Sequence, residues 1–203
     1  MSDLAALKAR IADELNRSDL TSQIASAITR AIEFYADERF SFNEGRLTLS
    51  TTASSDYADY PTGLRKIDSV YATVGGHRYE LVKREFDELD RWHGASDTSG
   101  QPLDYAVRGT QFYIYPTPNA AYALAVTGIY DQPALSADTD TNAWCTGVAQ
   151  DLITSRCKYT IARDITFDSE VMRNSAIAER EALNRLRSET HALVADSRVS
   201  AGW

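Results

Sequence analysis

The stretch Arg46-Leu47-Thr48-Leu49-Ser50-Thr51-Thr52 is where the hydrophobic periodicity of this chain changes. Within it, leucine and polar residues alternate and β-branched threonine is frequent, which is typical of a strand. Before it, apolar residues recur at every third or fourth position, which is typical of amphipathic helices. The sequence therefore predicts a change from helices to strands near Arg46.

Two short helices are predicted before this change. The apolar stripe of the first helix consists of Leu4, Leu7, Ile11 and Leu15. The segment 16–19 breaks the pattern, and we expect Ser18 or Asp19 to cap the second helix. The apolar side of the second helix consists of Leu20, Ile24, Ala27, Ile28, Ala31 and Tyr35. We expect this helix to fray near Phe40 and to be closed by residues 43–45. Two consecutive amphipathic helices favour an antiparallel hairpin.

The middle of the chain reads as a small antiparallel β unit. Alternating, β-prone segments follow at 65–74, 77–82, 103–108, 110–115 and 122–130. Gly75-Gly76 can supply the positive φ angles of a tight hairpin turn. Between the strands, residues 83–92 indicate a short helix with Phe86 and Leu89 on its apolar side.

Two longer helices are predicted in the last third. The first begins near Asn142, runs to about Asp164 and carries Trp144, Val148, Leu152 and Tyr159 on one face. The second, from about Asp168 to Ala195, carries Met172, Ala176, Leu183 and Leu186. Its other sides are heavily charged, and Glu181 with Arg185 forms a favourable i,i+4 pair.

The order of elements predicts an α+β fold. Helices at both ends would pack as one helical bundle formed by residues 1–45 and 136–203, with a small antiparallel β lobe inserted at residues 46–135. The final polar segment, 196–203, has no periodicity.

The charge balance argues against sequence-specific DNA binding. The chain has 203 residues, 29 acids against 21 bases and a formal net charge of −8. Proteins that grip phosphates need a basic face. The acidic surface is either a solvated surface or a wall past which DNA slides without sticking. No apolar run approaches the roughly 18 residues that span a bilayer, and Asp3 stands where a signal peptide is basic, so we expect a soluble protein made in the cytoplasm.

No catalytic residue, metal site or cofactor site is predicted. His77, His93 and His191 fall in three different elements, without an HxxxH or CxxC neighbour. Both cysteines, Cys145 and Cys157, fall in the predicted helix after Asn142. Twelve helical residues separate them by about 18 Å, too far for a disulfide, so we expect reduced core residues.

One stretch partly matches a calcium-binding loop. Residues 138–142 read Asp-Thr-Asp-Thr-Asn, as in the first ligand positions of an EF-hand. Ala143 and Ala149 then occupy the positions of the required glycine and glutamate, so the match fails. We expect instead that Asp140, Thr141 or Asn142 caps the following helix.

The order of several short pieces resembles the phage head-to-tail adaptor family, over about residues 5–190. The pieces are Tyr-Pro-Thr-Gly-Leu-Arg-Lys-Ile-Asp-Ser-Val at 60–70, Gly-Gln-Pro-Leu-Asp-Tyr-Ala at 100–106, Ile-Tyr-Pro-Thr-Pro at 114–118, Tyr-Asp-Gln-Pro-Ala-Leu-Ser at 130–136 and Thr-Asn-Ala-Trp at 141–144. No single piece is diagnostic, and the likeness lies in the order in which the pieces occur along the chain.

This resemblance implies a structural virion protein and not an enzyme, located at the head–tail junction. Such adaptors form a ring, commonly twelve-fold, beneath the portal protein and bind a stopper, nozzle or tail component below. DNA passes through the channel without specific binding, and neither a cofactor nor a membrane is involved. The charged final helix suits a ring interface, for which the candidates are Arg180, Glu181, Arg185 and Arg187.

The C-terminal segment is the candidate portal-binding arm. Its residues are Ser197, Arg198, Val199 and Trp203, with Trp203 as an anchor and Arg198 as a polar contact. Aromatic and arginine side chains dominate binding hot spots. In an isolated monomer, however, a terminal tryptophan is simply loose.

Three other functions stay open. The protein could be a stopper, head-completion or tail-terminator protein, which differs in its neighbours and not in its chemistry. It could be a small hydrolase or metal-dependent enzyme, if His77, His93 or His191 converged with acids in a pocket. It could also be a cytoplasmic interaction module.

Overall fold

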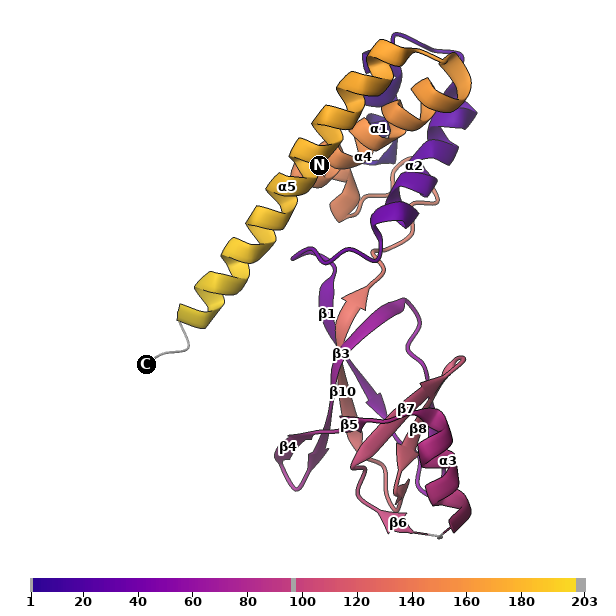
Figure 1. The fold of residues 1–203 in the computed structure, drawn as a ribbon, viewed down its shortest axis with the longest axis vertical. Helices are drawn as coiled ribbons and strands as arrows, with labels where there is room; N and C mark the ends of the chain where they lie inside the picture. Colours follow the sequence, from indigo (N-terminus) through magenta and orange to yellow (C-terminus); the bar gives the residue numbers. More distant parts are fainter. Residues whose placement is uncertain (1, 96–97, 200–203) are drawn as a thin grey trace. The chain divides into compact units, whose positions relative to one another are not determined.

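The computed structural model describes residues 2–95 and 98–199, and the chain divides into two compact units (Figure 1). The helical unit comprises residues 1–43 and 131–203, and the β unit comprises residues 44–130. The chain thus crosses between the units twice, at 43–44 and at 130–131. The mixture of helices and mainly antiparallel strands confirms the α+β class.

The helical unit contains four α-helices, a 3₁₀ turn and a π turn within its described residues. They are α1 (Leu4–Glu14), α2 (Thr21–Tyr35), η1 (Ala143–Cys145), α4 (Gly147–Ile161), η2 (Ala162–Thr166) and α5 (Ser169–Val199). Side chains from both ends of the chain form one core, and its largest fully buried members are Leu7, Ile11, Ile24, Phe40, Trp144, Leu152, Ile153 and Ile161.

Trp144 lies at the centre of an aromatic cluster. Its ring meets Phe42 edge-on at 4.8 Å between centroids and Phe40 at 5.8 Å, while Phe40 and Phe42 stack at 5.4 Å. Beside it, the Gln132 side-chain amide donates to the Phe42 carbonyl oxygen at 2.7 Å. The two points where the chain leaves and re-enters the helical unit are therefore tied to each other within that unit.

The loop 136–142 is ordered by side-chain acceptors. The Asp140 carboxylate accepts from the backbone N–H groups of Ser136 and Ala137, both at 2.7 Å. These bonds lower the pKa of Asp140, and the bond from the Ala137 N–H has the larger effect. Asn142 Oδ1 accepts from the Trp144 N–H at 3.0 Å and caps η1. The expected cap at 140–142 therefore falls on Asn142, but it caps this 3₁₀ turn, and the long helix α4 begins after Thr146 without a side-chain cap.

Several predicted helix ends were wrong. α2 begins after Leu20 without a side-chain cap, because Asp19 is paired with Arg17 instead. α2 also ends at Tyr35, before the predicted fraying point at Phe40. Cys145 lies in η1 and not in the long helix, because Thr146 is extended (φ −129°, ψ 153°). Both cysteines are free and buried, as expected.

Among its described residues, the β unit contains two four-stranded sheets. The first has the order β1-β10-β3-β4 and is antiparallel throughout; its strands are β1 (Glu44–Ser50), β3 (Leu64–Val74), β4 (His77–Glu80) and β10 (Ala123–Tyr130). The second has the order β2-β8-β7-β5; its strands are β2 (Tyr57–Asp59), β5 (Val82–Lys83), β7 (Asp104–Arg108) and β8 (Gln111–Tyr115). Two further short strands pair in parallel, β6 (Ser99–Gly100) with β9 (Thr117–Pro118). The sheets share a core formed by Val70, Ala72, Phe112, Ile114, Leu124 and Val126.

The predicted strand 77–82 is in fact two strands. β4 returns along β3 after the Gly75-Gly76 turn, whose φ angles of 55° and 83° confirm the hairpin. Leu81 is buried, and beyond it β5 pairs in parallel with β7 in the second sheet. The helix α3 (Phe86–Ala95) then buries Leu89 completely. The chain changes sheets at Leu81 because its side chain enters the shared core.

Gly128 lies at an irregularity in the pairing of β10 with β3. The register shifts between Thr127 and Gly128, so that Thr127 faces Ser69 and Gly128 faces Ile67. A Cβ atom at position 128 would lie 1.9 Å from the Lys66 carbonyl oxygen, a backbone atom. Only glycine allows this close approach of two strands.

Replacing Gly128 by alanine should therefore destabilise the β unit. We expect Gly128→Ala to lower the free energy of unfolding by about 3 kcal/mol or to prevent folding, because backbone must move. Chemical denaturation followed by circular dichroism measures this. Gly100→Ala is the control, since its Cβ would meet nothing within 4 Å. Equal effects of the two variants would contradict the prediction.

Candidate functional site

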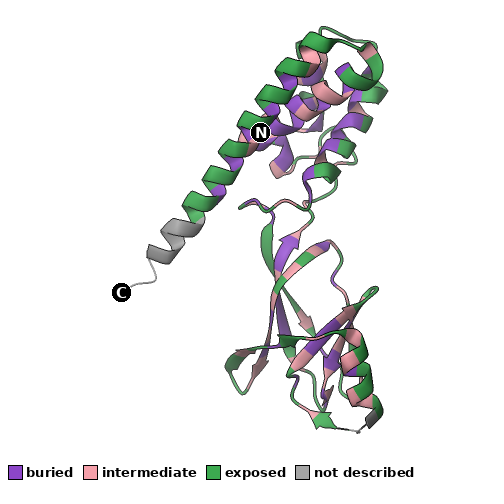
Figure 2. Ribbon diagram, in the orientation of Figure 1, coloured by how far each residue is buried: buried purple, intermediate pink, exposed green. Residues whose placement is uncertain are grey.

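α5 is the longest helix of the described chain, and its buried stripe is mainly polar. Ser175, Glu179, Ala182, Leu186 and Thr190 are buried, while most of the helix surface is exposed (Figure 2). The predicted apolar side was only partly right: Leu186 is buried, Met172 and Leu183 are half-buried, and Ala176 is exposed. Hydrophobic periodicity could not identify a stripe in which Glu179 and Thr190 are buried through hydrogen bonds.

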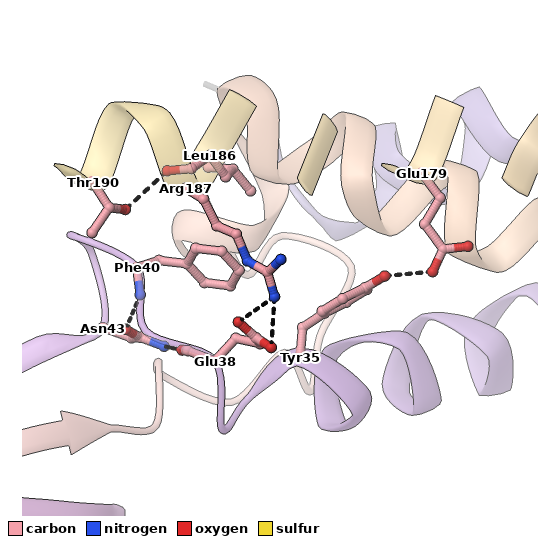
Figure 3. A network of polar contacts seen from close by, with 8 residues as sticks. All are labelled: Tyr35, Glu38, Phe40, Asn43, Glu179, Leu186, Arg187 and Thr190. Atoms are coloured by element: carbon pink, nitrogen blue, oxygen red, sulfur yellow. Dashed lines mark hydrogen bonds and ion pairs between the residues drawn. The ribbon is translucent and has the colours of Figure 1, made fainter. Parts of the chain in front are cut away.

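Glu179 is the centre of the first polar contact between α5 and its neighbours. Its carboxylate accepts a short hydrogen bond from the Tyr35 hydroxyl of α2 (Figure 3). It also accepts from Arg156 Nη1 of α4 at 3.2 Å. Burial, followed by the bond to Glu179, raises the pKa of Tyr35. One acidic side chain thus joins three helices.

A second polar contact lies about three turns further along α5. The Thr190 hydroxyl donates to the Leu186 carbonyl at 2.9 Å and accepts from the Ser41 N–H at 3.1 Å. Asn43 braces the same segment: its Oδ1 accepts from the Phe40 N–H, and its Nδ2 donates to the Glu38 carbonyl (Figure 3). The segment after α2 is therefore held against α5 without continuing as a helix.

The four predicted ring-interface residues are all exposed on α5, but they make different contacts. Arg187 forms an ion pair with Glu38 at 3.0 Å within the helical unit (Figure 3). Arg185 is bonded to Glu189 at 3.2 Å, so the predicted pair with Glu181 was wrong. Among residues 2–95 and 98–199, no ion pair involves Arg180 or Glu181. These two charges are available to a partner.

The predicted portal-binding arm is described only in part. α5 continues through Ser197, Arg198 and Val199, past its predicted end at Ala195. The side chains beyond Leu193 and all of Trp203 lie outside the described residues. The assignment of the arm stays a prediction.

A groove lies between α2, α4 and α5, and the sequence pattern does not predict it. The residues that line this α2–α5 groove are Phe34, Tyr35, Glu38, Arg156, Ala176, Glu179, Arg180 and Leu183. The Arg156 guanidinium lies 3.8 Å from the centre of the Phe34 ring, which is 59% exposed. The available signal was Phe34 itself, an aromatic residue outside the apolar side of α2.

The histidines do not converge. His77 lies on β4, His93 on α3 and His191 on α5. His93 Nε2 donates to the Ile114 carbonyl at 3.2 Å. In the part of the chain that the structure describes, no three His, Cys, Asp or Glu side chains gather as a metal-binding group. No helix in that same part is both long and apolar enough to cross a membrane.

The chain matches the model of a known protein family. The model of the family described as SU10 adaptor protein matches residues 2–201, which is nearly the whole chain and includes both units. No curated protein matches the chain.

The bond between Tyr35 and Glu179 should contribute measurably to stability. Tyr35→Phe leaves a buried carboxylate with Arg156 as its remaining side-chain partner, so we expect the free energy of unfolding to fall by about 2 kcal/mol. Thermal or chemical denaturation measures the change. Thr29→Ala, which removes an exposed hydroxyl from the same helix, should change it by less than about 0.5 kcal/mol. A Tyr35→Phe variant as stable as the parent would show that the bond is not stabilising.

Proposed function

The chain belongs to the SU10 adaptor protein family, a family of phage head-to-tail adaptors, and from this premise we propose that it forms a ring beneath the portal of a tailed phage or phage-like particle. The match over residues 2–201 is the observation that carries the proposal. In this role the protein has no catalytic step, and it joins the portal to a stopper, nozzle or tail component. We expect it at the head–tail junction of the virion.

The proposed arrangement of each subunit is a helical bundle that carries an inserted β lobe. The division of the chain at residues 43–44 and 130–131 supports it. In a ring, the long exposed surface of α5 is the natural subunit boundary, because it carries charges with no partner inside the described chain, Arg180 and Glu181. The number of subunits that we propose is twelve, as is common in phage adaptors.

The acidity of the protein fits a channel that DNA traverses. With a net charge of −8, the surface repels phosphates and does not bind them. A moving duplex would meet no strong binding site along such a wall. We therefore propose passage of DNA without specific recognition.

We propose that the C-terminal arm binds the portal. Its residues Ser197, Arg198, Val199 and Trp203 follow directly along α5 or lie just beyond it. Trp203 would be buried in the portal and Arg198 would make a polar contact, as in other hot spots. The exposed helix would present the arm at a fixed distance from the bundle core.

A stopper, head-completion or tail-terminator protein of the same particle is the alternative role. Electron microscopy of particles from the source, with this chain traced in the density, tests both roles. A ring of this subunit in contact with the portal supports the adaptor role. A position elsewhere in the neck or tail would favour the alternative, and absence from the particle would contradict both.

Removing the arm should abolish portal binding without unfolding the protein. We expect deletion of residues 197–203 to leave the thermal transition unchanged, and Trp203→Ala to weaken binding to purified portal by about 30-fold, the effect of about 2 kcal/mol at a hot spot. Biolayer interferometry on immobilised portal rings measures the binding, and thermal denaturation measures the transition.

The matched control for the arm is an exposed aromatic side chain of the β unit. Tyr57→Ala changes a side chain that is 45% exposed on β2, and we expect it to bind the portal as the parent does. Portal binding that survives deletion of residues 197–203 would contradict the proposed role of the arm.

A further inference from the structure

The α2–α5 groove has the features of a binding site for an aromatic side chain. Its apolar walls are Phe34, Ala176 and Leu183, and the Arg156 guanidinium lies 3.8 Å from the centre of the Phe34 ring. A guanidinium plane stacks favourably with aromatic rings. Arg180 lies in the lining as a charge without an ion pair among the described residues. The groove therefore suits an aromatic side chain accompanied by a carboxylate.

The turn between α4 and α5 presents such a side chain. Phe167 is 80% exposed, the most exposed large hydrophobic side chain of the described residues, and Ile165 beside it is 39% exposed. Phe167 also adopts the left-handed backbone conformation, with φ 53° and ψ 33°. Bulky residues disfavour this conformation, and such residues cluster at functional positions. We call Ile165 and Phe167 the knob.

The knob is rigidly held. The backbone N–H groups of Phe167 and Asp168 both donate to the Ala162 carbonyl at the end of the π turn. On the other side, the Asp168 carboxylate accepts from the N–H groups of Glu170 and Val171 at 3.0 Å and caps α5. A partner would therefore bind a knob whose backbone is already ordered, which limits the loss of backbone conformational entropy.

A carboxylate accompanies the knob. Glu170 is exposed one residue into α5, and no ion pair within the described ranges involves it. The knob thus offers an aromatic ring and an unpaired acid, while the groove offers aromatic and aliphatic walls and an unpaired base, Arg180. The knob and the groove are therefore complementary in apolar character and in charge.

We propose that the Phe167 knob of one copy inserts into the α2–α5 groove of a neighbouring copy, with Glu170 facing Arg180. Within one chain this insertion is impossible, because Ala176 in the groove lies about 10 Å along α5 from its first residue. Two different patches of the same chain form a head-to-tail contact, which repeats and yields a ring when the rotation closes. The proposal rests on the proposed ring and names the residues of its subunit contact.

The first test is a disulfide between copies. The double variant Phe167→Cys, Ala176→Cys places thiols on the knob and on an exposed groove position. The native thiols, Cys145 and Cys157, are buried. Under oxidation, with purified portal rings present as a template, the double variant should give a ladder of covalent multimers on non-reducing gels. Each single variant is a control and should stay monomeric or stop at a dimer.

The outcomes separate this inference from the proposed function. Electron microscopy of the same samples shows whether a ring has formed on the portal. A ring without a covalent ladder would overturn the knob-and-groove contact and leave the adaptor role intact. A ladder without portal binding would support the contact and count against the adaptor role. Absence of both would overturn both.

A charge exchange provides an independent test. Glu170→Arg and Arg180→Glu should each weaken self-association about fivefold, as measured by analytical ultracentrifugation, and the double variant should restore it. Asp13→Arg, which changes an exposed carboxylate on α1 in the same way, should have no effect. A double variant that associates as weakly as the single variants combined would contradict the pairing.

Discussion

The helical unit depends on one constraint: the buried stripe of α5 is mainly polar, so its carboxylate and its threonine hydroxyl need hydrogen-bond partners, whereas the Ser175 hydroxyl is buried without one among the described residues. Glu179 meets this need through Tyr35 of α2 and Arg156 of α4. Thr190 meets it through the Ser41 backbone. Because such bonds are directional, they fix how α5 is rotated and where it lies along α2, which apolar contacts alone would leave loose. The opposite surface of α5 is thereby presented in a defined orientation.

This rotation also decides which charges of α5 are used inside the subunit and which remain for a partner. Arg187 is turned toward Glu38 and forms an ion pair with it. Arg180 lines the α2–α5 groove and has no ion pair among the described residues. The exposed charges of one helix therefore differ in whether they are already paired within the subunit. The internal bonds of α5 use some of its charges, such as Arg187, and leave Arg180 and Glu181 without an ion pair among the described residues.

The sequence was informative where apolar residues carry the structure and less so where polar residues do. The stripe Leu4, Leu7 and Ile11 and the alternation in β8 identify their elements, because hydrophobic burial follows the period of the element. The end of α2 and the buried face of α5 depend on Asn43 and Glu179, whose roles arise from partners distant in sequence. The family resemblance was confirmed. The bundle-with-lobe arrangement, the ring and the arm stay predictions, and the knob at Phe167 has no hydrophobic periodicity that could reveal it.

The tie between Gln132 and Phe42 has a consequence for how such a protein can change over time. It joins the two ends of the segment that forms the β unit, and both residues belong to the helical unit beside Trp144. When the two ends of an inserted segment are bonded to each other, the surrounding unit tolerates changes in that segment, because its own core does not depend on the inserted residues. The β unit is thus a module that can be lengthened, trimmed or exchanged to suit a different neighbour while the helical unit keeps its sequence constraints. The two units can therefore change in sequence at independent rates.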